Sequence, residues 1–192
     1  MMSMRSLCFF AGARPARDSD HTEAARAVAR AAAARGLGLV YGGGGGGMMG
    51  VLAEAAIEAG VHIVGVAPRF LSDREVLAAG LSELVMVDSM GERKDVMFDR
   101  ASAFLTLPGG LGTYDELFEV LSGNYLDLIG KPCGVLNVNG YFEPLVAMID
   151  GGVRAGFIGR GARDAMLVDG DAERLVSRLL AAAAPAAPAV SG

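Results

Sequence analysis

The chain has 192 residues, and 52% of them are hydrophobic, which suits one globular domain with a sizeable core. Its net charge of −5 and the lack of any basic stripe argue against nucleic acid as a partner. No apolar run approaches the roughly 18 residues that a membrane span requires, so we expect no membrane partner.

The two cysteines and the first residues indicate a cytoplasmic protein. Cys8 and Cys133 both lie in apolar, strand-like runs, and we expect buried, reduced thiols rather than a disulfide or a zinc site. Residues 1–10 are too short and too strand-like for a signal peptide. We therefore expect a cytoplasmic location and no bound metal.

Short apolar runs alternate with helical segments along the chain. The expected strands are residues 7–10, 37–41, 61–66, 84–87, 103–107 and 135–138. The expected helices are residues 20–35, 48–59, 89–101, 113–121, 142–151 and 171–182. Asp18, Ser19 and Asp20 are N-cap candidates for the first helix, and Gly36 is placed to end it.

This alternation predicts an α/β fold, namely a single-domain, Rossmann-like, doubly wound parallel sheet with helices on both faces. We expect the domain to span residues 1–182 and the Ala/Pro-rich residues 183–192 to form a disordered tail. Ligands of such sheets bind at the carboxyl ends of the strands. Two glycine-rich turns stand at those ends.

The first glycine-rich turn, residues 42–47, consists of six consecutive glycines between an expected strand and an expected helix. Gly42, Gly44 and Gly47 match the dinucleotide spacing G-x-G-x-x-G, but six glycines match almost any glycine pattern. A dinucleotide site also expects an acid about 20 residues on, and the next strand ends without one. A Walker-type loop expects Lys where Met48 stands. The turn is either an anion cradle or a tight, flexible connection.

The second glycine-rich turn, residues 108–113, reads Pro-Gly-Gly-Leu-Gly-Thr and leads into an expected helix. Glycines leave main-chain N–H groups free, and the helix N-terminus behind them favours an anion such as phosphate. Thr113 can cap this helix or donate its hydroxyl to a phosphate oxygen. Glu116 either closes the helix start at capping-box spacing or points its carboxylate into the anion cleft to act on a sugar.

A charged segment, Glu92-Arg93-Lys94, opens the helix before the fifth strand. Cations at a helix N-terminus oppose the helix dipole. With no structural gain in view, Arg93 and Lys94 indicate either an anionic ligand or a solvated basic face. Glu75 falls in a long connection and has no structural reason of its own.

Together these motifs resemble the Lonely-guy family of phosphoribohydrolases, which act on cytokinin riboside 5′-monophosphates and were in part labelled lysine decarboxylases. The resemblance covers residues 7–180 and rests on Gly42-Gly43-Gly44-x-x-Gly47-x-Met49-Gly50, Glu92-Arg93-Lys94 and Pro108-Gly109-Gly110-x-Gly112-Thr113-x-x-Glu116. It implies a Rossmann-like fold, a homodimer and no metal or organic cofactor. It also implies hydrolysis of the N-glycosidic bond of a nucleoside 5′-monophosphate, AMP or N6-modified AMP, to free base and ribose 5-phosphate.

The resemblance implies roles for individual residues. Arg93 and Glu116 match the family's essential Arg and Glu and are the expected catalytic residues. The expected substrate-binding residues are Gly43, Gly44, Gly47, Met49, Glu75, Lys94, Gly109, Gly110, Leu111, Gly112, Thr113, Tyr114, Asp115 and Ser122.

The chain also departs from the family pattern. Gly91 stands where His is usual, Ala11-Gly12-Ala13 where a Cys-Gly-Ser run is usual, and Gly123 and Tyr125 where Trp and Gln are usual. These departures bear on the base preference more than on the reaction class.

Two other functions stay open. A non-catalytic nucleotide-binding or cofactor-carrier protein on the same fold is favoured by Gly91, Gly123 and Tyr125 and disfavoured by the retained Arg93 and Glu116. A dinucleotide-dependent oxidoreductase is disfavoured because no acid follows the third strand. The decarboxylase label lacks support, since no residue pattern indicates a pyridoxal-phosphate lysine site.

Overall fold

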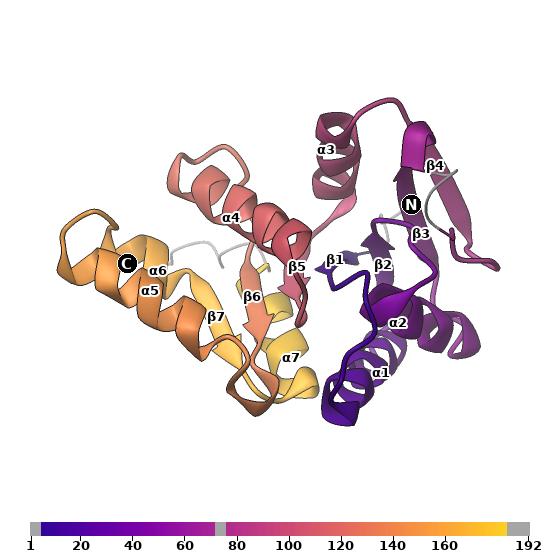
Figure 1. The fold of residues 1–192 in the computed structure, drawn as a ribbon, viewed down its shortest axis with the longest axis horizontal. Coiled ribbons are helices and arrows are strands. Elements are labelled where there is room, and N and C mark those ends of the chain that lie inside the picture. Colours follow the sequence, from indigo (N-terminus) through magenta and orange to yellow (C-terminus); the bar gives the residue numbers. More distant parts are fainter. Residues whose placement is uncertain (1–4, 72–75, 184–192) are drawn as a thin grey trace, which may run out of the picture.

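A single parallel sheet organises the computed structural model, which describes residues 5–71 and 76–183 (Figure 1). Its strand order is β4-β3-β2-β1-β5-β6-β7. The strands are β1 Ser6–Phe10, β2 Gly38–Tyr41, β3 Ile63–Pro68, β4 Glu83–Val87, β5 Ala103–Thr106, β6 Cys133–Leu136 and β7 Met166–Asp169. Every pairing between neighbouring strands is parallel. The predicted α/β, doubly wound fold is confirmed.

The helices cover the sheet on both sides (Figure 1). They are α1 Ser19–Ala33, α2 Gly47–Glu58, α3 Met90–Arg100, α4 Leu111–Tyr125, α5 Glu143–Arg154, α6 Arg160–Asp164 and α7 Ala172–Ala182, with the short 3-10 turns η1 Arg69–Leu71 and η2 Val138–Gly140. Helices α1, α2 and α7 contribute to one core layer, whereas α3, α4 and α5 contribute to the layers on the opposite face. In this strand order the chain runs outward from β1 in one direction and then returns to β5, β6 and β7 on the other side of β1. The gap between the loops after β1 and β5 is therefore the expected ligand site.

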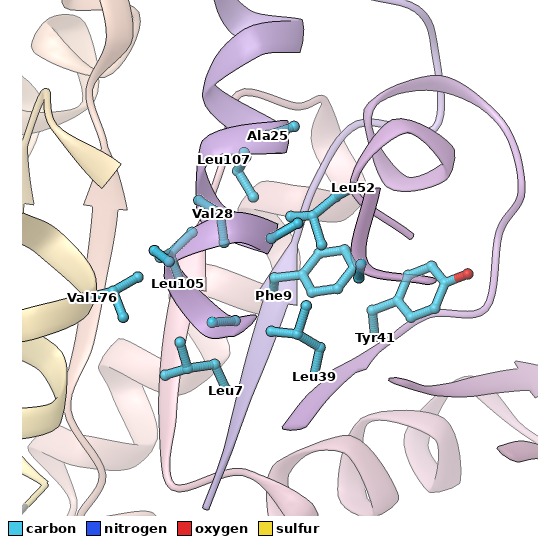
Figure 2. Close-up of a cluster of buried hydrophobic side chains, with 14 of the residues drawn as sticks. Leu7, Phe9, Ala25, Val28, Leu39, Tyr41, Leu52, Leu105, Leu107 and Val176 are labelled. Atoms are coloured by element: carbon cyan, nitrogen blue, oxygen red, sulfur yellow. The ribbon is translucent and has the colours of Figure 1, made fainter. Parts of the chain in front are cut away.

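The central strand β1 illustrates how the sequence builds the two layers. Its side chains alternate, so Leu7 and Phe9 belong to the α1/α2 core while Cys8 and Phe10 belong to the α3 core. Phe9 stacks on Tyr41 of β2 with ring centroids 4.8 Å apart, as Figure 2 shows. Cys8 and Cys133 are free and buried, as predicted.

Most predicted elements are present, with corrected boundaries. Asp18 caps α1 by accepting the Asp20 N–H at 2.9 Å, and Gly36 follows the helix with φ +60°. Strand β6 runs from Cys133 to Leu136 rather than over residues 135–138, and α4 begins at Leu111 rather than at residue 113.

Two elements were missed, and one predicted feature cannot be compared. Strand β7 and the short helix α6 had no predicted counterpart.

No helix among residues 5–71 and 76–183 is long and apolar enough to cross a membrane. The predicted tail lies outside the described residues from residue 184 onward.

Candidate functional site

A cleft of about 850 Å³ opens where the loops after β1 and β5 meet. It is lined by Ala11, Gly12, Ala13, Arg14, Pro15, Ala16, Arg17, Asp18, His21, Met48, Met49, Leu71, Met90, Arg93, Pro108, Gly109, Gly110, Leu111, Gly112, Thr113, Asp115, Glu116 and Tyr141. The switch point of the sheet therefore holds a site large enough for a nucleotide-sized ligand.

The N-terminus of α4 forms one wall of this cleft and is open to it. Gly110 is the N-cap and makes no side-chain cap, because it has none. Within the described part of the chain, the N–H groups of Gly110, Leu111, Gly112 and Thr113 have no hydrogen-bond partner. Free N–H groups at the positive end of a helix dipole are suited to an anion.

Thr113 is buried at the back of this turn. A Cβ placed on Gly109 would lie 2.1 Å from the Thr113 Oγ1 atom, so only glycine allows this close packing. Thr113 does not cap α4, since the helix has already begun at Leu111. Its hydroxyl is left beside the open N–H groups.

Glu116 and Arg93 converge in the cleft from two different helices. Both are buried, and the Arg93 Nη1 atom lies 3.6 Å from the Glu116 Oε1 atom. That distance makes an ion pair but not a hydrogen bond. Glu116 lies beyond the first turn of α4, so it does not close the helix start. The sequence left two roles open for Glu116, closing the helix start or placing its carboxylate in the cleft, and the geometry supports the second.

Burial dominates the protonation of Glu116. Desolvation raises the pKa of this carboxyl group to about 7, and the Arg93 guanidinium only partly offsets the shift. A carboxyl group whose pKa lies close to the working pH can exchange protons during a reaction. Such a shift in a cleft is typical of a catalytic residue.

Arg93 is held rigidly by the main chain. Its Nε atom donates to the Val66 carbonyl and its Nη2 atom to the Gly42 carbonyl, each at 3.1 Å. A Cβ on Gly42 would lie 1.6 Å from the Nη2 atom, so this glycine makes room for the guanidinium. The expectation that Arg93 has no structural partner is wrong.

Lys94 points toward α4 rather than standing free. Its Nζ atom donates to Asp115 at 3.2 Å and also pairs with Glu119. The hydrogen bonds that Lys94 donates to the Glu119 and Asp115 carboxylates raise its pKa. The expectation that Lys94 has no structural gain is therefore also wrong, and α3 is tied to α4 through this group.

The first glycine-rich turn is filled by the protein itself. The Gly45 N–H donates to the Val76 carbonyl at 2.7 Å, and the Gly43 carbonyl accepts from the Ala78 N–H at 3.0 Å. The Met48 N–H at the start of α2 donates to the Gly12 carbonyl at 2.9 Å. The N–H groups of Met48 and Met49 in the first turn of α2 are thus engaged by the Gly12 carbonyl, whereas those of Gly46 and Gly47 have no partner among the described residues.

The remaining predicted site residues fall in different places. Met49, Gly109 and Asp115 line the cleft. Residue Gly47 faces a neighbouring cavity of about 640 Å³, and Ser122 lines a third cavity of about 300 Å³ between α4 and α5. Gly44 forms an antiparallel bridge with Leu77, and the ring of Tyr114 packs edge-on against Phe142. Glu75 lies outside the described residues.

Several residues of the cleft were not among the site residues predicted from the sequence. Tyr141 follows η2, and its hydroxyl donates to the Gly109 carbonyl at 2.5 Å. Arg14 and Arg17 stand exposed in the loop after β1. The ring of His21 lies edge-on to Tyr141 with centroids 5.6 Å apart. A usable signal existed for Tyr141, because the Asn-Gly turn before it follows a buried strand ending at the same edge of the sheet.

Comparison with known proteins gives matches along most of the chain. A family model described as "possible lysine decarboxylase" matches residues 49–179. A cytokinin riboside 5′-monophosphate phosphoribohydrolase of Rhodococcoides fascians is 40% identical over 176 residues, which cover 91% of this chain and 89% of that protein. The enzyme LOG2 of Arabidopsis thaliana, of the same name, is 36% identical over 175 residues, covering 91% of this chain and 82% of that protein.

Solved structures share the fold at low identity. A molybdenum cofactor binding protein from Rippkaea orientalis superposes with a TM-score of 0.70 at 16% identity, covering 94% of this chain and 98% of that one. A molybdenum cofactor carrier protein from Chlamydomonas reinhardtii gives 0.67 at 18% identity, covering 93% and 99%. At such identities the likeness concerns the fold alone.

Proposed function

The chain belongs to the family of cytokinin riboside 5′-monophosphate phosphoribohydrolases, and we propose that it hydrolyses the N-glycosidic bond of a nucleoside 5′-monophosphate. The substrate class is AMP or N6-modified AMP, and the products are the free base and ribose 5-phosphate. One observation carries the proposal: the buried Glu116–Arg93 pair lies in the same cleft as the open N-terminus of α4.

The 5′-phosphate binds at the start of α4. Four N–H groups there have no hydrogen-bond acceptor among the described residues and are therefore available as donors, namely those of Gly110, Leu111, Gly112 and Thr113. The Thr113 hydroxyl adds one more donor beside them. A phosphate held there anchors the nucleotide while the ribose extends along α4 toward Glu116.

Glu116 acts on the ribose. When the bond between C1′ and the base nitrogen breaks, its electron pair goes to the base and positive charge develops on the sugar ring. The ionised Glu116 carboxylate stabilises that charge and takes up the proton of the water that adds to C1′, while the departing base takes a proton from solvent. The pKa of about 7 suits this exchange at neutral pH.

Arg93 keeps Glu116 in place and in the ionised form. Its Nε and Nη2 atoms are engaged by the Val66 and Gly42 carbonyls, and its Nη1 atom faces Glu116. The guanidinium lowers the pKa of Glu116 against the effect of burial, so a larger fraction of the carboxyl group is ionised at pH 7.

Decarboxylation of lysine does not fit the cleft. Pyridoxal phosphate requires a lysine side chain that reaches the cofactor. The chain has two lysines: Lys94 is paired with Asp115 and Glu119, and the Lys131 Nζ atom donates to the Phe98 carbonyl at 2.7 Å. Both ammonium groups are thus engaged by other groups of the protein, and neither lysine lines the cleft.

The test is a substrate panel. The protein is incubated with AMP, CMP, GMP and an N6-prenylated AMP, and the release of free base and ribose 5-phosphate is measured. We expect release from AMP or its N6-modified form and none from adenosine, which lacks the phosphate. Tight binding of one nucleotide without release from any would instead support the cofactor-carrier function.

We further propose a cytoplasmic homodimer. The two cysteines are buried free thiols, which suits a reducing compartment. Around the cavity between α4 and α5, Phe118, Tyr125, Leu126 and Phe157 are exposed, Phe157 to 91%. Such a patch is suited to burial against a second copy of the chain. Light scattering after gel filtration tests this, because a monomeric mass would contradict the dimer.

A further inference from the structure

We propose that Tyr141 is a positioning residue for the phosphate-binding turn. Its hydroxyl holds the peptide between Gly109 and Gly110 in the orientation that offers an N–H group, rather than a carbonyl, to the phosphate. This inference rests on the proposed function, because it assumes that the phosphate binds at the start of α4.

The backbone of Tyr141 is anchored without its hydroxyl. In the turn after β6, Asn139 and Gly140 adopt φ of 50° and 72°, and the Tyr141 N–H donates to the Val138 carbonyl at 3.0 Å. The Asn139 amide donates to the Asp18 carboxylate at 2.8 Å, which ties this turn to the start of α1. The turn therefore holds the main chain at Tyr141, and edge-on packing against His21 and Phe142 holds its ring, so the hydroxyl can serve another group.

The hydroxyl of Tyr141 sets the direction of one peptide plane. It donates to the Gly109 carbonyl at 2.5 Å. Among the described residues every peptide bond is trans, so the Gly109 C=O and the Gly110 N–H point in opposite directions. Fixing the carbonyl toward Tyr141 therefore also fixes the direction of the Gly110 N–H.

This peptide needs a side chain to hold it. Glycine stands on both sides of it, so rotation of the peptide plane meets little steric resistance. A rotated plane would place the Gly109 carbonyl where the Gly110 N–H had pointed. The neighbouring planes are held by the main chain: the Pro108 carbonyl accepts from the Gly12 N–H at 3.1 Å, and the Gly110 carbonyl accepts from the Tyr114 N–H at 3.0 Å. Only the Gly109 carbonyl depends on a side-chain hydroxyl in this part of the described structure.

The experiment compares Tyr141→Phe with Tyr41→Phe in binding of ribose 5-phosphate, measured by calorimetry. Tyr41 is the matched control, because its buried hydroxyl has no hydrogen-bond partner among the described residues and it does not line the cleft. We expect Tyr141→Phe to weaken ribose 5-phosphate binding about 3- to 10-fold, the range of one hydrogen bond, and Tyr41→Phe to change it less than about twofold. In turnover of the nucleotide, KM rises and kcat stays nearly constant, since the phosphate is bound equally in the ground and transition states.

A second probe separates positioning from general damage. Adenosine, which has no phosphate, is expected to bind both variants as it binds the parent protein. Unchanged ribose 5-phosphate binding in Tyr141→Phe, equal losses in the two variants, or an equal loss for adenosine would each overturn this inference alone. Failure of the parent protein to bind ribose 5-phosphate would overturn the proposed function, and this inference with it.

Discussion

The turns at residues 42–47 and 108–113 both join a parallel strand to a helix at the same edge of the sheet, but their main-chain groups meet different partners. In the first, Gly45 donates to Val76 and the N–H of Met48 in α2 donates to Gly12, so that only Gly46 and Gly47 at the helix start have N–H groups without a described partner. In the second, the N–H groups from Gly110 to Thr113 meet no described residue. Glycine thus allows close packing of the protein on itself in one turn and approach of a ligand in the other.

The close packing of the first turn still serves the site. Without a side chain on Gly42, the Arg93 guanidinium can reach the Gly42 and Val66 carbonyls and face Glu116. The first turn therefore supports the position of a charged group, and we propose that the second turn binds the ligand. Substitutions should separate these contributions, with stability affected in the first turn and catalysis or binding affected in the second.

The largest expected effect is at the helix behind the second turn. Glu116→Gln removes the charge that stabilises the sugar and receives the proton, so turnover should fall at least about 100-fold, in line with the usual contribution of a positioned acid or base. The melting temperature should hardly change, since Gln keeps the shape of a buried side chain. Steady-state kinetics and calorimetry on the same preparation measure both. Near-normal turnover would refute the catalytic role.

The second effect is on pH dependence. Because burial raises the pKa of Glu116 to about 7, kcat/KM should fall about tenfold for each pH unit below 7. The window from pH 6 to 8 isolates this group, since the second pKa of a phosphate monoester lies near 6. A flat profile across that window would contradict the assignment.

The same group should also affect stability. A carboxyl group whose pKa is raised on folding binds its proton more tightly in the folded state, so its contribution is present below the ordinary pKa of 4.5 and is lost as the pH rises toward 7. Urea unfolding of the parent protein should therefore show a loss of stability over this window that Glu116→Gln lacks.

The third effect is in the first turn. Gly47 has φ +60°, and a Cβ there would lie 2.4 Å from the Ala13 carbonyl carbon. Gly47→Ala should therefore lower the free energy of unfolding by about 1–3 kcal/mol through strain and overpacking. Urea unfolding measures it. Unchanged stability together with a loss of ribose 5-phosphate binding would mean that this turn, too, binds the ligand.

The smallest effect is the matched change in the second turn. A Cβ on Gly112 would have no atom within 4 Å, so the Gly112→Ala variant should fold normally. Its free energy of unfolding should rise by up to about 1 kcal/mol, because Ala has a higher helix propensity than Gly. The added methyl narrows the approach to the open N–H groups, so KM should rise about 5-fold, or about 1 kcal/mol. A stability loss as large as that of Gly47→Ala would erase the distinction between the turns.

The sheet and most helices were predictable because their signals are local. Apolar runs of a few residues and glycine stops such as Gly36 mark elements wherever they occur. Strand β7 was missed because its middle residues, Leu167 and Val168, are only partly buried and belong to an edge strand. Helix α4 was placed two residues late because Gly110 caps it without a side chain, while Thr113 resembles a cap.

The site was only partly predictable because its contacts are long-range. Arg93 and Glu116 could be selected as a pair from their motifs, but the carbonyls that hold Arg93 come from Gly42 in the turn after β2 and from Val66 on β3. The pairing of Lys94 with residues of α4 requires the packing of two helices, which no local pattern encodes. For the same reason, the six glycines of residues 42–47 left an anion cradle and a tight connection both open, and only the fold shows that the N–H groups of Gly45 and Met48 are engaged by the protein itself.

The central claim is that phosphate is bound by the turn at residues 108–113 with Glu116 at the sugar. The most direct test is a crystal structure of the protein with ribose 5-phosphate. We expect phosphate oxygens within hydrogen-bond distance of the N–H groups from Gly110 to Thr113, and the Glu116 carboxylate against the ribose ring. A phosphate on the turn at residues 42–47, or a ribose directed away from Glu116, would contradict it.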